Sequence, residues 1–125
     1  MLLGVLAMTA FMSAQAGPVD PFLQSLVNDL NQGLPRTIDR TTRLDTARAG
    51  AGNRLTYYFT ITTQDVANLN VKQLRAKQIP KARNGACTTP NIRALLDAGV
   101  TYVYHYSDRS GRFVTEFEIS SADCT

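Results

Sequence analysis

The chain has 125 residues, of which 44% are hydrophobic, and its thirteen Lys and Arg against ten Asp and Glu leave a net charge of +3. A hydrophobic fraction of this size supports a folded core, so the composition excludes a disordered chain. The small net charge gives no strong case for nucleic acid or for a membrane as the partner.

The first sixteen residues have the character of a secretory leader. Leu2 to Met12 is an apolar run, and Ala14-Gln15-Ala16 has the small-x-small form of a cleavage site. The alternative is a membrane anchor, but a spanning helix needs about 20 apolar residues, and the run from Leu2 to Met12 is far shorter. We therefore expect residues 1–16 to be a signal peptide and residues 17–125 to form a single domain that is periplasmic or secreted, without a stable membrane anchor once the leader is cleaved.

Two cysteines, Cys87 and Cys124, are present in the whole chain. In an oxidising compartment two cysteines most often form one disulfide, which we predict here. A redox-active pair is the alternative, but reactive cysteines usually lie two residues apart.

The first element of the mature chain is predicted to be a helix. Asp20 can cap its free N–H groups, and Pro21 suits the first helical position because an N–H is not needed there. Gly33 and Pro35 end it. Its apolar residues recur on one face: Phe22, Leu23, Leu26, Val27 and Leu30.

Two strands joined by a glycine-rich turn are predicted to follow as an antiparallel hairpin. Residues 37–46 are rich in β-branched and polar residues, which is typical of a one-sided edge strand. Residues 49–53 form the turn. Residues 54–62 alternate between an apolar face and a face with Tyr58 and threonines.

Two helices are predicted after this hairpin. Residues 65–86 have an imperfect apolar stripe, and Pro80 should kink or end that helix because proline lacks an N–H and clashes with the preceding turn. The second, shorter helix is capped by Thr88 or Thr89, opens at Pro90 and stops at Gly99.

The last two strands, residues 100–107 and 112–119, are joined by the hairpin turn 108–111. Phe113, Phe117 and Ile119 are expected to face inward. The predicted element order is α-β-β-α-α-β-β. This order indicates an α+β domain with a four-stranded antiparallel sheet, helices on one face and the disulfide Cys87–Cys124.

No catalytic motif is found in the sequence. His105 is the single histidine, in mid-strand, and too few further ligands remain for zinc once the cysteines are oxidised. Two carboxylate pairs on strands could flank a sugar bond, but outward carboxylates usually serve solubility: Asp39 with Asp45, and Glu116 with Glu118. We predict no metal, no cofactor and no enzymatic activity.

A candidate binding surface combines one tyrosine with a basic stretch. Helices on the tyrosine face would bury Tyr57 and the other strand tyrosines as core and leave Tyr58 exposed. Every charged residue between Asp65 and Asp97 is basic, which suits an acidic partner or anionic lipid headgroups, or else the solvated face of a helix. The surface comprises Tyr58, Lys72, Arg75, Lys77, Lys81 and Arg83.

The second half of the chain has the residue skeleton of a known group of proteins. It reads Cys87-Thr88-Thr89-Pro90, Leu95-Leu96, Gly99-Val100, Tyr102, Tyr104, Asp108, Gly111 and Cys124, preceded by Leu34-Pro35 and Ile38-Asp39…Thr42-Arg43-Leu44. Residues 34–124 thereby resemble small exported bacterial domains of unknown function and are similar to the pilotins of one type II secretion class. The resemblance implies a curved antiparallel sheet, helices on one face and a Cys–Cys bond at this spacing. Pilotins carry a lipidated cysteine after the leader, which this chain lacks, and no functional residue is carried over.

These observations predict a non-enzymatic binding or accessory protein, with an envelope or secretion assembly as its expected setting. The expected partner is another envelope or secreted protein and not nucleic acid. The alternative is an inhibitor or immunity protein against a secreted hydrolase. Such a protein presents polar loops to an enzyme cleft, and residues 49–53 and 108–111 are the candidates.

Overall fold

The computed structural model describes residues 17–125, so the predicted leader lies outside the described residues. The described part is an α+β fold with three α-helices and five strands. In chain order these are α1 (Pro21–Asn31), β1 (Arg36–Asp39), β2 (Thr42–Gly50), β3 (Arg54–Ile61), α2 (Val71–Thr88), α3 (Pro90–Asp97), β4 (Thr101–Ser107) and β5 (Phe113–Ile119), with short 3-10 helices η2 (Val66–Asn68) and η3 (Ser121–Cys124).

The strands form one mixed sheet in the order β1-β2-β3-β4-β5. The prediction of four antiparallel strands is wrong in two respects. The expected strand 37–46 reverses after Asp39 and becomes β1 and β2. β3 and β4 are parallel, with Leu55 opposite Tyr102, because α2 and α3 carry the chain back to the end of the sheet at which β3 begins.

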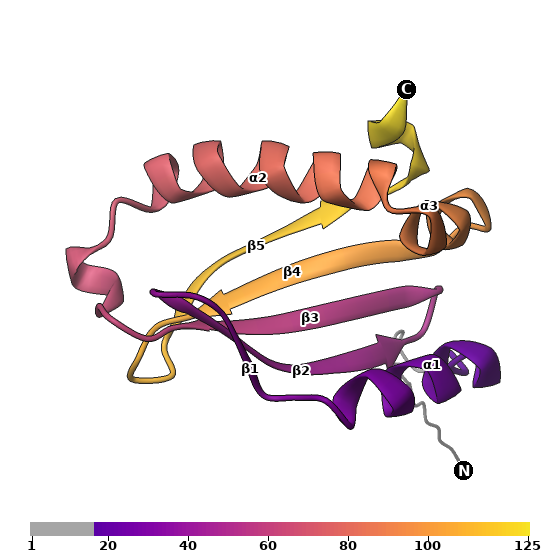
Figure 1. Cartoon of the computed structure of the whole chain (residues 1–125), viewed down its shortest axis with the longest axis horizontal. Coiled ribbons are helices and arrows are strands. Elements are labelled where there is room, and N and C mark those ends of the chain that lie inside the picture. The colour runs from indigo at the N-terminus through magenta and orange to yellow at the C-terminus, as the bar shows by residue number, and fades with distance from the viewer. Residues whose placement is uncertain (1–16) are drawn as a thin grey trace, which may run out of the picture.

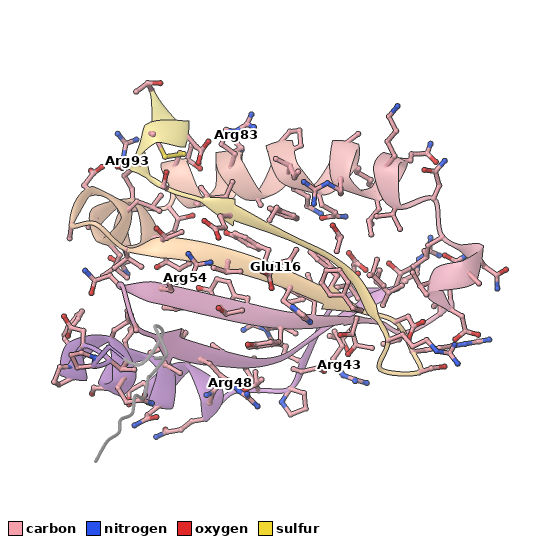
Figure 2. The ribbon with its side chains drawn as sticks, turned by 180° about the vertical axis from the view of Figure 1, so that it is seen from behind. Arg43, Arg48, Arg54, Arg83, Arg93 and Glu116 are labelled. Carbon is pink, nitrogen blue, oxygen red and sulfur yellow. A yellow bond between two sulfur atoms is a disulfide. The ribbon has the colours of Figure 1, made fainter. Side chains whose placement is uncertain are left out.

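The helices cover one face of this sheet, which we call the helical face. Figure 1 shows α1 beside β2, α2 beside β5 at the other edge, and α3 at the end where β4 begins. The opposite face, called the open face, carries no helix of the described chain and is seen in Figure 2. The predicted placement of the helices on one face is therefore confirmed.

Two buried clusters fill the space between the helices and the sheet. The larger one lies under α1, α3 and the end of α2, and the smaller one lies at the far end of β3, β4 and β5. Both draw on alternate residues of the strands, as burial of one sheet face requires. Their main members are Leu23, Val27, Leu55, Leu96, Tyr102 and Ile119 in the first, and Ile61, Tyr106, Val114 and Phe117 in the second.

The predicted starts of α1 and α3 are confirmed, whereas α2 begins at Val71 and not at residue 65. Asp20 Oδ1 accepts a hydrogen bond of 2.8 Å from the N–H of Phe22, and Pro21 opens α1. Pro90 opens α3. Each start depends on residues within one turn, which is why sequence reasoning finds it.

Pro80 does not end its helix, because α2 continues through this residue to Thr88. Pro80 is on the exposed side of the helix, where water can hydrate the carbonyl that loses its N–H partner. Ile79 and Ala82 pack against the sheet clusters on either side of it. Tertiary packing thus holds both halves in one helix. Residues 65–70, before α2, were also expected to be helical, but they form η2 and a loop.

Phe113 does not face inward as the alternation predicts, since its side chain is 58% exposed. The ladder between β4 and β5 is irregular after the pair Tyr106–Thr115, and Ser107 pairs with Phe113. The extra residue, Val114, takes the inward position and is buried. Phe117 and Ile119 are buried as predicted.

Asn31, the last residue of α1, fixes this helix to the sheet. Its Oδ1 accepts a hydrogen bond of 2.8 Å from the N–H of Ala47, and its Nδ2 donates one of 2.9 Å to the Ala47 carbonyl. Ala47 lies beyond the last residue of β2 that pairs with β1. Asn31 therefore satisfies backbone groups that would otherwise lack a strand partner.

The predicted disulfide is confirmed. Cys87 in the last turn of α2 is bonded to Cys124 in η3, with a Cα–Cα distance of 5.4 Å, inside the usual range. The bond ties the chain end to the helical layer. None of the helices in residues 17–125 is long and apolar enough to cross a membrane.

Asp108, in the turn between β4 and β5, is turned inward and only 1% exposed. Its carboxylate accepts hydrogen bonds of 2.8 Å from the N–H groups of Val66, Ser110 and Arg112. Burial favours the neutral acid, but these three donors hold the pKa of Asp108 below its ordinary value. Asp108 thus fastens η2 to the turn, and its side chain is not presented to a partner.

The lowered pKa of Asp108 predicts a loss of stability in acid. Since the folded pKa lies below the unfolded value of about 3.9, the contribution is present above that pH and is lost as the pH falls through the folded pKa. Asp108→Asn keeps an oxygen for Ser110 and Arg112 but places an NH₂ against the N–H of Val66. The variant should be less stable than wild type at pH 7, and the difference should shrink below pH 4. Urea unfolding between pH 7 and pH 2 measures this, and equal differences at all pH values would contradict it.

Candidate functional site

The helical face contains an apolar hollow of about 320 Å³ between α1, α3 and the sheet. Its volume is at the small end of the range for ligand pockets, about 300–1,000 Å³. Aliphatic side chains form its walls and two tyrosines form its base. The lining residues are Leu26 and Leu30 of α1, Thr89, Asn91, Ile92 and Leu95 at and within α3, Tyr57 of β3 and Tyr102 of β4.

The wall from α1 exists because the apolar stripe of this helix is wider than its contact with the sheet. At about 100° per residue, the stripe from Phe22 to Leu30 covers roughly 140°. Leu23 and Val27 are buried, whereas Leu30 is 38% and Phe22 67% exposed. Of the two exposed residues, Leu30 lines the hollow and Phe22 does not.

A continuous set of aromatic rings extends from the hollow across β3 and β4, and we call it the aromatic floor. Tyr57 lies 5.6 Å from Tyr102 and 5.7 Å from Tyr104 between ring centres, and Phe59 lies 4.9 Å from Tyr106. The parallel register places Tyr57 opposite Tyr104 and Phe59 opposite Tyr106. Tyr57, Phe59 and Tyr104 are half-buried, so the helices do not fully cover the floor.

The hydroxyl groups of the floor have no hydrogen-bond partner among the described residues. Those of Tyr57, Tyr102, Tyr104 and Tyr106 form no hydrogen bond with another residue of 17–125, and no buried side-chain oxygen there lacks a partner. Tyr57 and Tyr104 are half-buried, whereas Tyr102 and Tyr106 are only 1% and 5% exposed, so the first two are the more accessible to a partner.

Burial raises the pKa of Tyr57, and burial with the neighbouring tyrosines raises the pKa values of Tyr102 and Tyr104 well above the ordinary value of 10. Burial, assisted by the charge of Asp39, raises the pKa of Tyr106 to about 12. All four therefore remain neutral at physiological pH. Each can both donate and accept a hydrogen bond.

Tyr58, which the sequence assigns to a binding surface, lies on the open face. It is half-buried, with the Arg48 guanidinium carbon 5.3 Å from its ring centre and the His105 ring 5.0 Å away. Figure 2 shows Arg48, Arg54 and Glu116 over the strands of this face. Tyr58 is thus a member of a packed surface cluster and not of the hollow.

The carboxylates of the strands are engaged in local contacts. Glu116 Oε1 lies 2.9 Å from His105 Nδ1, and Glu118 forms an ion pair with Arg54. Asp45 is paired with Arg43, and Asp39 accepts hydrogen bonds from Thr41. Within residues 17–125 no three His, Cys, Asp or Glu side chains are grouped to hold a metal ion.

The basic residues of the candidate surface are on α2, beyond β5, and are separated from Tyr58 on β3 by two strands. Lys72, Lys77, Lys81 and Arg83 are exposed. Arg75 instead lies on the edge of β5, where its Nη1 donates to Thr115 Oγ1 at 2.7 Å and to the Glu116 carbonyl at 2.9 Å. The structure therefore gives Arg75 a contact within the fold.

The hollow itself is absent from the sequence-based site prediction, because its walls come from two helices that are distant in the chain. One signal was available, namely that the apolar stripe of α1 is too wide for a single contact face. The excess identifies an apolar edge on α1. It does not show that α3 lies opposite.

Comparison with solved structures shows the fold in other proteins. A "putative secreted protein" from Pseudomonas aeruginosa superposes with a TM-score of 0.69 at 16% identity, over 83% of this chain and 90% of that one. The pilotin EpsS of the Vibrio vulnificus type 2 secretion system gives 0.68 at 15% identity, over 83% and 89%. The type II secretion pilotin AspS of Vibrio cholerae gives 0.63 at 17% identity, over 82% and 89%.

These likenesses confirm the predicted pilotin-like skeleton as a likeness of fold. Among curated proteins none matches the chain. The sequence profile of one family, described as "Putative quorum-sensing-regulated virulence factor", matches residues 12–125. The match covers nearly the whole chain, including every element of the fold, and the chain therefore belongs to that family.

Proposed function

We propose that this protein is a non-enzymatic accessory protein of an envelope or secretion assembly, and that it holds an apolar segment of a protein partner in the hollow between α1 and α3. The observation that carries the proposal is the combination of an apolar hollow with tyrosine hydroxyls at its base that form no hydrogen bond within residues 17–125. Apolar walls bind side chains, while a few placed polar groups fix their orientation.

Two features of the site support a protein segment as the ligand. Aromatic residues are enriched in the cores of protein interfaces, and tyrosine offers a large contact area with one hydrogen-bonding group. The exposed apolar edge of α1 extends the hollow with a surface that a peptide can cover.

The chemistry of the hollow supports a role in binding. Its lining includes no carboxylate, histidine or thiol, and its two tyrosines have raised pKa values that make them poor general bases at neutral pH. His105 belongs to β4 and packs on Tyr58 at the open face. The described residues thus offer the hollow no acid–base pair.

The disulfide supports a periplasmic or secreted location, since such bonds persist in oxidising compartments. The solved proteins that share the fold include two secretion pilotins and a secreted protein by their descriptions. An envelope protein is therefore the proposed class of partner.

A matched pair of substitutions on α1 tests the site. Leu30→Glu places a charge in the wall of the hollow, whereas Phe22→Glu places the same charge on the same helix outside it. Both residues are exposed, so neither change should alter stability by much more than about 0.5 kcal/mol. The partner is the protein that the wild-type chain recovers from an envelope extract, identified by mass spectrometry. The amount of this partner recovered should fall at least tenfold with Leu30→Glu, which corresponds to about 1.4 kcal/mol of binding free energy. It should be unchanged with Phe22→Glu.

Two results would contradict the proposal. If the wild-type chain recovers no specific protein, the proposed accessory function is contradicted. If the two variants lose equal amounts of the partner, the protein has a partner but does not bind it in the hollow.

A further inference from the structure

Helix α2 has a concentration of positive charge that the net charge of the chain conceals. All three lysines of the chain, Lys72, Lys77 and Lys81, are on this helix, with Arg83 two residues further on, and residues 66–96 include no Asp or Glu. All four side chains are exposed. None of them forms an ion pair with another residue of 17–125.

The carboxylates at the ends of α2 have partners of their own. Asp65 is paired with Arg109, and Asp97 with Arg93. Asp123, in η3 near the end of α2, accepts a hydrogen bond of 2.8 Å from the N–H of Ser120.

Two carboxylates, Asp39 and Asp123, lie near the cations of this helix: a hydrogen bond from the Thr41 N–H and, more weakly, the charge of Lys81 lower the pKa of Asp39, and Asp123 lines one surface hollow with Arg83. The four α2 cations nevertheless form no ion pair within residues 17–125, which the sequence by itself could not show.

Beside Lys77 the surface contains a polar hollow of about 450 Å³. Apart from Lys77, the polar side chains of its lining are all carboxamides, from Gln64, Asn68, Asn70 and Gln73. Carboxamides donate and accept hydrogen bonds without adding charge. Such a lining suits a ligand that combines a phosphate with hydroxyl groups.

We propose that α2 docks on the surface of an anionic membrane, with Lys72, Lys77, Lys81 and Arg83 against lipid phosphates and the carboxamide hollow against the hydroxyls of phosphoglycerol headgroups. The long aliphatic side chain of a lysine lets its ammonium group extend beyond the helix surface and contact a phosphate. In Figure 1 α2 forms one edge of the molecule and α1 lies at the opposite edge, so docking of α2 leaves α1 free.

The composition of this face favours lipid over an acidic protein. Between the cations the outer side of α2 presents Gln73, Ala76, Pro80 and Asn84, with no aromatic or large aliphatic residue. The cores of protein interfaces are enriched in such residues and depleted in lysine. Basic clusters on helices, by contrast, bind anionic headgroups through charge.

Two triple variants of the full chain test the proposal at equal net charge. K72Q/K77Q/K81Q removes the lysines of α2. R36Q/R40Q/R112Q removes three exposed arginines outside α2, none of which forms an ion pair within residues 17–125. Residues 1–16 are the same in both, so their contribution to binding cancels. The measurement is partition onto vesicles of phosphatidylglycerol mixed with phosphatidylcholine, and onto phosphatidylcholine vesicles, at 0.1 M and 1 M salt.

Each lysine near an anionic surface contributes about fivefold to partition, so the lysine variant should bind the anionic vesicles about a hundredfold less than wild type. The arginine variant should lose less than tenfold. Wild-type binding should weaken at 1 M salt, where the screening length falls to about 3 Å.

The proposal would be overturned if the two variants lost equal amounts of vesicle binding, or if replacing the lysines left binding to the anionic vesicles unchanged. Polyglutamate serves as a probe for an acidic protein. Lysine-dependent binding to polyglutamate without binding to the anionic vesicles would assign α2 to an acidic protein and also overturn it.

Discussion

Replacing Cys87 or Cys124 by serine should lower the free energy of unfolding by about 2–4 kcal/mol. The bond closes a segment of 37 residues, for which the chain-entropy account gives an upper figure of about 4 kcal/mol. It also holds η3 on the helical layer, where Ser121, Ala122 and Asp123 are exposed and contribute little buried surface. Urea unfolding at pH 7, followed by circular dichroism, measures the loss.

The double variant C87S/C124S is the control for this experiment. Reducing agent should destabilise the wild-type protein to the level of the double variant and leave the double variant unchanged. Hydrogen exchange should show lost protection first in η3 and the last turn of α2. Two free thiols in protein recovered from the exported fraction, measured by mass spectrometry, would contradict both the bond and the oxidising compartment.

Tyr102→Ala should lower the free energy of unfolding by about 3–5 kcal/mol, the range for removal of a large buried ring. Tyr102 is 1% exposed and lies in the cluster with Leu55, Leu96 and Ile119. Its ring is stacked on Tyr57 at 5.6 Å. Removing it would leave a cavity that rigid strands on both sides cannot close. Chemical unfolding monitored by fluorescence of the remaining tyrosines measures the effect.

Tyr102→Phe separates the ring from its hydroxyl. Because the hydroxyl has no partner within residues 17–125, the phenylalanine variant should lose less than about 1 kcal/mol of stability. Under the proposed function it should nevertheless recover less of the partner from an envelope extract, since the hydroxyl lies at the base of the hollow. A phenylalanine variant as unstable as the alanine variant would show that the hydroxyl is needed by the fold.

Features that depend on a few neighbouring residues could be predicted from the sequence. Asp20 and Pro21 define the start of α1, and Pro90 that of α3, because capping involves groups within one helical turn. The apolar alternation of residues 54–61 identifies β3 and its buried face. With two cysteines in the chain, the pairing of Cys87 with Cys124 has no competitor.

The direction of the strands could not be predicted in the same way. A strand that is buried on one face has the same alternation whether its neighbour is parallel or antiparallel. The parallel pairing of β3 with β4 is decided by the route of α2 and α3, which return the chain to the start of β3. The exposure of Phe113 likewise depends on a bulge opposite β4, and the continuity of α2 through Pro80 depends on packing against the sheet.

Apolar periodicity predicts most of the side chains that become buried, with Phe113 as an exception, but the places where burial is incomplete depend on how the elements pack together. Leu26 and Leu30 belong to a predicted apolar face, and Tyr57 and Tyr102 are among the tyrosines predicted as core. Only their meeting around one hollow distinguishes them from ordinary core residues. Hydrophobic periodicity records the tendency of each element to be buried, but the fit between elements is a property of their three-dimensional arrangement. The charge on α2 follows the same reasoning, since the partners of Asp65, Asp97 and Asp123 are set by folding.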